Sequence, residues 1–215
     1  MDEEISIINT ESRIDKIKKY LISSRKRLTI LIIVILLILI GFFGYSKHLN
    51  EKRLQISELY NTATLNFISN QNKNIKDQLV YIIKAKDPTY SPLALYFIIE
   101  NDIISSKNEI NDYFNVIINE INLEKEIKYL IIYKKALFNS ENENENELLE
   151  IINPLLKSDS IWKSHALYLM AEYFYANGQP QKAKDFYTQI INLEKANNKI
   201  KLESQKRLNR ELSEK

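Results

Sequence analysis

The longest uninterrupted apolar segment of the chain covers residues 28–45 and reads LTILIIVILLILIGFFGY. It contains no charged residue, and Thr29 is the only appreciably polar side chain before the aromatic end. At about 1.5 Å per residue, a helix over this segment is about 27 Å long, close to the hydrocarbon thickness of about 30 Å in a bilayer. Because lipid offers the backbone no hydrogen bonds, a segment inside it must be helical. The pattern predicts a transmembrane helix at 28–45.

Basic residues are concentrated before this segment, with seven preceding it and three following it closely: Arg13, Lys16, Lys18, Lys19, Arg25, Lys26 and Arg27, then Lys47, Lys52 and Arg53. The basic side of a membrane helix stays in the cytoplasm. We therefore predict a cytoplasmic tail at 1–27 and an exported C-terminal part. The main alternative is a signal peptide cut after Ser46. Its long, partly acidic N-terminal region and the bulky Phe42, Phe43 and Tyr45 argue against cleavage.

Helical spacing of apolar residues also occurs within the tail, at Ile7, Ile14, Ile17 and Leu21. It predicts a short amphipathic helix that lies on the lipid headgroups. A helix that binds a partner protein is the alternative.

Beyond the span, the apolar residues recur with the period of a helix throughout. One stripe covers residues 56–67 and a second covers residues 75–83, with a polar break between them. Asp87-Pro88 is expected to end the second helix, because a residue before proline avoids the helical conformation. We assign residues 46–90 to membrane-proximal helices. The pattern leaves open whether the first of them is a stalk or part of the following domain.

Residues 91–215 are predicted to form three helical hairpins and a final helix. Ser91 is expected to cap the first helix, with Pro92 at its first position. The hairpins pair residues 93–104 with 110–121, 127–138 with 148–156, and 161–175 with 183–190. Gly178 is placed to end a helix in left-handed geometry, and Pro180 to begin the next. The polar residues 199–215, with Ile200, Leu208 and Leu212, are predicted to form a capping helix. The predicted fold class is all-α, an α-solenoid behind a single membrane helix.

Composition narrows the range of functions. The chain has only three glycines, which argues against glycine-rich phosphate loops and against sheets with many tight turns. It has no cysteine, so thiol chemistry and disulfides are excluded. The formal net charge is +2, from 30 basic and 28 acidic residues, which does not indicate a nucleic-acid partner. The acidic connector at 140–147 lacks the glycine and ligand spacing of a calcium loop and is predicted to be solvated.

The third hairpin resembles a tetratricopeptide repeat (TPR), a helix–turn–helix unit of about 34 residues. The residues at the signature positions are Leu167, Met170, Ala171, Phe174, Gly178, Ala183, Tyr187 and Ile190. Leu167 replaces the usual tryptophan, and no proline closes the unit near Lys195. The first two hairpins match only as amphipathic pairs.

The whole layout resembles the YfgM-like family, ancillary subunits of the bacterial SecYEG translocon. The resemblance rests on the tail fragment IDKIKKYL at residues 14–21, one span, Ser57-x-x-Tyr60-x-x-Ala63, and the TPR-like hairpins. It implies a single-pass inner-membrane protein with a periplasmic TPR-like domain, working beside translocon subunits, periplasmic chaperones or exported client proteins. The richness in Ile, Asn and Lys is similar to that of rickettsia-like bacteria.

No catalytic constellation is visible in the sequence. The two histidines, His48 and His165, lie far apart, and no carboxylate is placed to orient the adjacent Ser164 and His165. We therefore predict a protein that is not an enzyme and binds no cofactor or metal. The candidate site is a peptide-binding groove on the first helix of the third hairpin: His165, Tyr168, Leu169, Glu172 and Tyr175. These side chains offer contact area and polar tips. Packing on the neighbouring hairpin or on the capping helix is the alternative.

Two functions follow as hypotheses. The first is a protein-binding scaffold that assists the Sec translocon. The second is a general envelope scaffold that organises another membrane complex.

Overall fold

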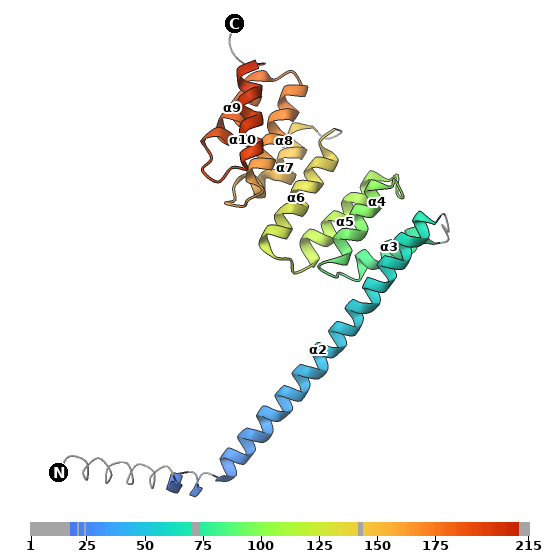
Figure 1. Cartoon of the computed structure of the whole chain (residues 1–215), viewed down its shortest axis with the longest axis vertical. Coiled ribbons are helices and arrows are strands. Elements are labelled where there is room, and N and C mark those ends of the chain that lie inside the picture. The colour runs from blue at the N-terminus through green and yellow to red at the C-terminus, as the bar shows by residue number, and fades with distance from the viewer. Residues whose placement is uncertain (1–17, 21, 24, 70–73, 142–143, 211–215) are drawn as a thin grey trace, which may run out of the picture. The chain divides into compact units, whose positions relative to one another are not determined.

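The computed structural model describes residues 18–20, 22–23, 25–69, 74–141 and 144–210, and within these ranges all regular structure is α-helical. The predicted all-α class is thereby confirmed. The helices are shown in Figure 1: α2 Arg25–Ile68, α3 Ile75–Lys84, α4 Tyr90–Glu100, α5 Lys107–Glu120, α6 Lys125–Asn139, α7 Glu145–Leu156, α8 Lys163–Ala176, α9 Pro180–Asn192 and α10 Asn198–Arg210.

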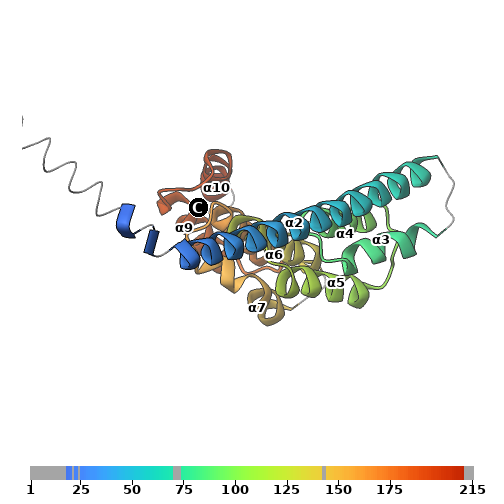
Figure 2. The same cartoon turned by 90° about the horizontal axis from the view of Figure 1, so that it is seen from below.

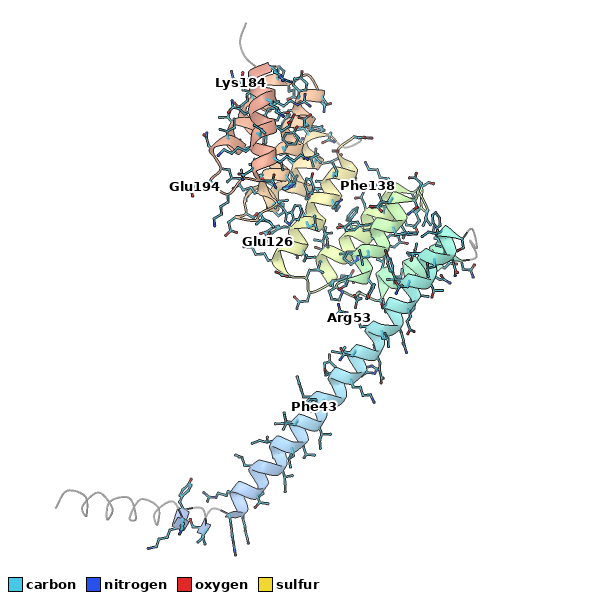
Figure 3. All side chains as sticks on the ribbon, in the orientation of Figure 1. Phe43, Arg53, Glu126, Phe138, Lys184 and Glu194 are labelled. Atoms are coloured by element: carbon cyan, nitrogen blue, oxygen red, sulfur yellow. The ribbon has the colours of Figure 1, made fainter. Side chains whose placement is uncertain are left out.

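The chain divides into two compact units, Met1–Gln55 and Ile56–Lys215. In the first unit, α2 begins at Arg25 and includes the predicted span. Among the described residues, it is the one helix long and apolar enough to cross a membrane, and none of the described side chains of that apolar part is buried. Phe43 is labelled on this helix in Figure 3. The same length and composition also fit a signal sequence. The predicted tail residues Ile7, Ile14, Ile17 and Leu21 lie outside the described residues.

The second unit is built from helices that pack against their neighbours in the sequence, from α3 with α4 through to α9 with α10. The order along this unit follows the order along the chain, as Figures 1 and 2 both show. Each predicted helical hairpin corresponds to two observed helices. The C-terminal end of the predicted connector at 140–147 is helical, because α7 already begins at Glu145, capped by the side chain of Asn144.

The first hydrophobic core of the second unit extends from Ile56 to Ile131. Ile56 and Ala63 of α2 are buried in it, and Tyr60 and Phe67 of α2 contact Phe97 of α4 edge-on. The predicted stripe of α3 is buried as a whole: Ile75, Leu79, Ile82 and Ile83. The C-terminal part of α2, from Ile56 onward, is therefore part of a packed helical unit. The predicted membrane-proximal helices at 46–90 and the residues that follow position 90 contribute to the same core.

Ser91 does not cap α4, contrary to the prediction. It lies inside the helix, fully buried, and its hydroxyl donates to the carbonyl of Ile82 at 2.9 Å. Asp87 provides the cap instead, since its Oδ1 accepts from the backbone N–H groups of Thr89 and Tyr90, both at 2.8 Å. A carboxylate one turn earlier satisfies the free N–H groups and allows the helix to begin before Pro92.

The second core is formed mainly by α6 to α9, and its centre is the contact between α8 and α9. Ala171 and Ala183 are both fully buried, which allows close approach of these two helices, and Tyr187 is buried beside them. Gly178 has φ +70°, and Pro180 is the first residue of α9. The predicted helix end, helix start and buried face of this hairpin are thus confirmed. Ile200 and Leu208 of α10 pack on the same core, whereas Leu212 lies outside the described residues.

Candidate functional site

The five predicted groove residues all lie on α8, but they do not form one open surface. Leu169 is only 9% exposed and belongs to the second core. His165, Tyr168 and Glu172 are partly buried, and Tyr175 is the most exposed of the five at 36%. Helix α10 packs against both α8 and α9, and its Arg207 contacts Glu172 and Tyr175 of this set.

Glu172 is the centre of a polar network between α8, α9 and α10. Its Oε1 accepts a hydrogen bond from the hydroxyl of Tyr187 at 2.5 Å, and its Oε2 accepts one from Nη2 of Arg207 at 2.9 Å. The side chains of Glu172 and Arg207 are each about one-third exposed. The guanidinium of Arg207 also lies over the ring of Tyr175, 5.7 Å from its centre. Both oxygens of the carboxylate are therefore used within the protein.

Tyrosine side chains surround this network. The rings of Tyr168 and Tyr187 meet edge-on with their centres 5.8 Å apart. Burial raises the pKa of Tyr187, and the hydrogen bond to Glu172 raises it further. Burial likewise raises the pKa of Tyr168, while the hydrogen bond to Arg207 opposes that rise. The alternative to a groove was packing of these residues on the capping helix. The structure contains such packing, because Arg207 of α10 contacts both Glu172 and Tyr175. Binding of a peptide there stays a prediction and requires access to this face.

His165 belongs to a different cluster, with the only tryptophan of the chain. The centre of its ring lies 4.9 Å from that of Trp162 and 5.7 Å from that of Tyr133 of α6. Burial lowers the pKa of His165. His48, by contrast, is exposed on α2.

A polar cleft of about 550 Å³ lies between α5, α6 and α7. Within its lining, the side-chain amides of Asn111 and Asn139 donate to each other at 2.9 and 2.8 Å. Lys135 donates to Asn115 at 2.7 Å, and burial lowers the pKa of Lys135. These four side chains bond one another, which is typical of a polar contact between packed helices.

A smaller pocket of about 190 Å³ lies between α4, α5 and α6. Four apolar residues line it: Ile99, Phe114, Leu137 and Phe138. The other three lining residues have polar groups: Tyr96, Glu100 and Lys134. Sequence reasoning missed this pocket and the polar cleft. Their residues come from helices separated by many positions, and only the packing of those helices brings them together.

Within the described residues, no three side chains of the metal-binding types come close enough to hold a metal ion. No protein-family model, no curated protein and no solved structure matches this chain.

Proposed function

We propose that this protein is a membrane-anchored scaffold that binds other proteins and catalyses no reaction. The observation that carries the proposal is the unbroken course of α2 from Arg25 to Ile68. One end of that helix is apolar over a membrane-spanning length, and the other end is buried in a packed helical unit. A helical unit of this kind offers faces for recognition, and tethering it to a membrane raises its effective concentration near membrane-bound partners.

The packed unit is proposed to be a TPR-like solenoid. The close contact of α8 and α9 through Ala171 and Ala183, the left-handed Gly178 and the buried Tyr187 support this at the third hairpin. The polar helix α10 then closes the end of the stack, as terminal repeats commonly do.

The proposed location is the periplasmic face of the bacterial inner membrane, with the N-terminus in the cytoplasm. The excess of basic residues before the span supports this orientation. The proposed task is assistance at the Sec translocon, in the transfer of exported proteins to periplasmic chaperones. This task rests on the resemblance to the YfgM-like family.

Orientation can be tested with single cysteines, since the natural chain has none. Ser23→Cys and Ser69→Cys are suitable, because both side chains are exposed on opposite sides of the apolar segment. In intact spheroplasts, a membrane-impermeant maleimide should label the Ser69→Cys variant and leave the Ser23→Cys variant unlabelled. After lysis, it should label both variants. The reverse pattern would overturn the orientation. Release of the protein by alkaline carbonate would show that the apolar segment is not an anchor.

The partner is tested by crosslinking in native membranes, followed by affinity purification of the full chain. Translocon subunits should dominate the crosslinked products. Their absence, with another envelope complex enriched, would support the general scaffold instead. The predicted groove on α8 is tested with a double variant that combines Tyr168→Ala with Tyr175→Ala. Tyr81→Ala is a matched control, because Tyr81 is an exposed tyrosine of α3. Unchanged capture of partners by a folded double variant would exclude this face.

A further inference from the structure

The pocket between α4, α5 and α6 has the features of a binding site for one apolar side chain. Its walls are Ile99 of α4, Phe114 of α5, and Leu137 and Phe138 of α6. Phe138 is labelled in Figure 3. Leu137 is 43% exposed, although it lies among apolar neighbours. A cavity of about 150 Å³ with comparable walls holds a benzene molecule. The volume of about 190 Å³ is therefore enough for a leucine or phenylalanine side chain.

The hydroxyl of Tyr96 lacks a hydrogen-bond partner within the described structure, although it is buried. Burial raises the pKa of this tyrosine to about 12, so the hydroxyl keeps its proton and can act as a donor. A buried polar group without a partner is costly, and most such groups in folded proteins are satisfied. The protein covers the hydroxyl in this state, so a small movement of the Tyr96 side chain must accompany the binding of a ligand that supplies an acceptor and removes that cost.

Two opposite charges accompany Tyr96. The ammonium of Lys134 lies 5.7 Å from the centre of the Tyr96 ring. Glu100 lines the same pocket. Within the described ranges, neither Lys134 nor Glu100 forms an ion pair. The lining therefore offers one cation, one anion and one hydroxyl donor, with no net charge.

This set of charges selects among ligands. A free carboxylate or phosphate would be attracted by Lys134 but repelled by Glu100. A lipid chain is longer than a pocket of this volume can enclose. The main chain of a peptide carries an acceptor and a donor on either side of each side chain, and it is neutral.

We propose that this pocket binds a single leucine or phenylalanine side chain of an extended, neutral peptide segment. A main-chain carbonyl of the segment accepts from Tyr96 and Lys134, and a main-chain N–H donates to Glu100. The inference rests on the proposed protein-binding function, and it names the class of sequence that would be bound.

The test uses the full chain in a mild detergent and fluorescein-labelled, end-blocked nonapeptides of Gly and Ser with one variable central residue. Binding is followed by fluorescence anisotropy. Peptides with central Leu or Phe should bind about 10- to 100-fold more tightly than the peptide with central Ala, because only they bury a large apolar side chain. Equal affinity for Leu and Ala would overturn the proposal.

Three variants localise the binding. Tyr96→Phe should weaken the Leu peptide about 5- to 10-fold without loss of folding, since the hydroxyl has no partner in the protein. Lys134→Gln should weaken it about threefold. Lys128→Gln is the matched control, because Lys128 is exposed on the same helix and is not part of the pocket. Leu137→Asp should abolish the preference for Leu.

Failure of this inference is distinguishable from failure of the proposed function. If translocon subunits are still crosslinked while all pocket variants bind the Leu peptide normally, the pocket assignment is wrong and the scaffold stands. If the chain dimerises and Leu137→Asp abolishes the dimer, a second copy covers this pocket, and the peptide proposal is overturned.

Discussion

The contact between Arg207 and Glu172 offers the sharpest test of how the C-terminal helix is held. Arg207→Gln removes the guanidinium that donates to Glu172 Oε2 at 2.9 Å and that lies over the ring of Tyr175. Glutamine keeps part of the side-chain stem but loses the charge. Glu172 keeps its hydrogen bond from Tyr187. The substitution therefore weakens the junction of α8 with α10 and leaves the junction of α8 with α9 in place.

The expected magnitude follows from burial. A hydrogen bond to a charged group contributes about 1.5–3 kcal/mol, whereas a fully exposed ion pair contributes about 0–1 kcal/mol. The side chains here are 29% and 31% exposed, which places the contact between these limits. We expect Arg207→Gln to lower the free energy of unfolding by about 2 kcal/mol. For a chain of this size, that corresponds to a fall in Tm of roughly 4–8 °C.

Urea unfolding of the full chain in detergent, followed by fluorescence, measures this loss. Trp162 is the only tryptophan and packs on the second core, so its emission reports on the cluster that α10 covers. A double-mutant cycle with Glu172→Gln should give a coupling energy of about 1 kcal/mol. Arg210→Gln, an exposed arginine of the same helix, is the matched control and should change stability by less than about 0.5 kcal/mol.

Two results would refute this reasoning. The first is a loss of less than about 0.5 kcal/mol for Arg207→Gln, indistinguishable from the control. The second is a double-mutant cycle without coupling, in which the two single effects simply add. Either result would mean that the contact between Arg207 and Glu172 does not hold α10 against α8.

The remaining predictions concern pH and the third hairpin. Burial lowers the pKa of His165, so as pH falls the imidazole is protonated in the unfolded chain before it is protonated in the folded chain. The free energy of unfolding should therefore fall as pH drops below about 6.5. His165→Gln should reduce this loss, measured by acid titration of Trp162 fluorescence. The pKa of Tyr187 is raised, so stability should fall as pH rises above about 10, and Tyr187→Phe should reduce that alkaline loss in urea titrations at each pH. Gly178→Ala should cost about 1–2 kcal/mol in urea unfolding, because an alanine is strained at φ +70° even though its Cβ would meet no neighbour, and Gly178→Asn should cost less. Ala183→Leu should lower stability by about 1–3 kcal/mol by overfilling the contact of α8 with α9, whereas Ala176→Leu, at an exposed position of α8, should be nearly neutral by thermal unfolding.

Local patterns were sufficient for much of the fold. The stripe of Ile75, Leu79, Ile82 and Ile83 is buried as predicted, because helical period alone decides which face meets the core. Gly178 and Pro180 end and begin helices where predicted, because each acts through its own backbone. The prediction at Ser91 was wrong because the sequence offers two possible cap residues, and it is Asp87 that accepts from the free backbone N–H groups.

The site was less predictable, because it depends on contacts between distant residues. Nothing in the polar sequence of α10 singles out Arg207 as the side chain that reaches Glu172, 35 positions earlier. The pocket of Tyr96 and Lys134 likewise requires α4 and α6 to lie near each other. Helical period places a residue on a face, but it does not say which other helix covers that face.

The two cores meet at α6 through consecutive residues, with Ile131 buried in the first and Ile132 in the second. Successive residues of a helix point about 100° apart, so one helix can serve both clusters. Ile118 of α5 packs partly against each cluster as well. The cooperativity of unfolding in this unit therefore depends on α6. If α6 loosens, α7, α8, α9 and α10 become able to open as a separate foldon while the first core persists, and amide exchange would be faster in those four helices than in α3 and α4.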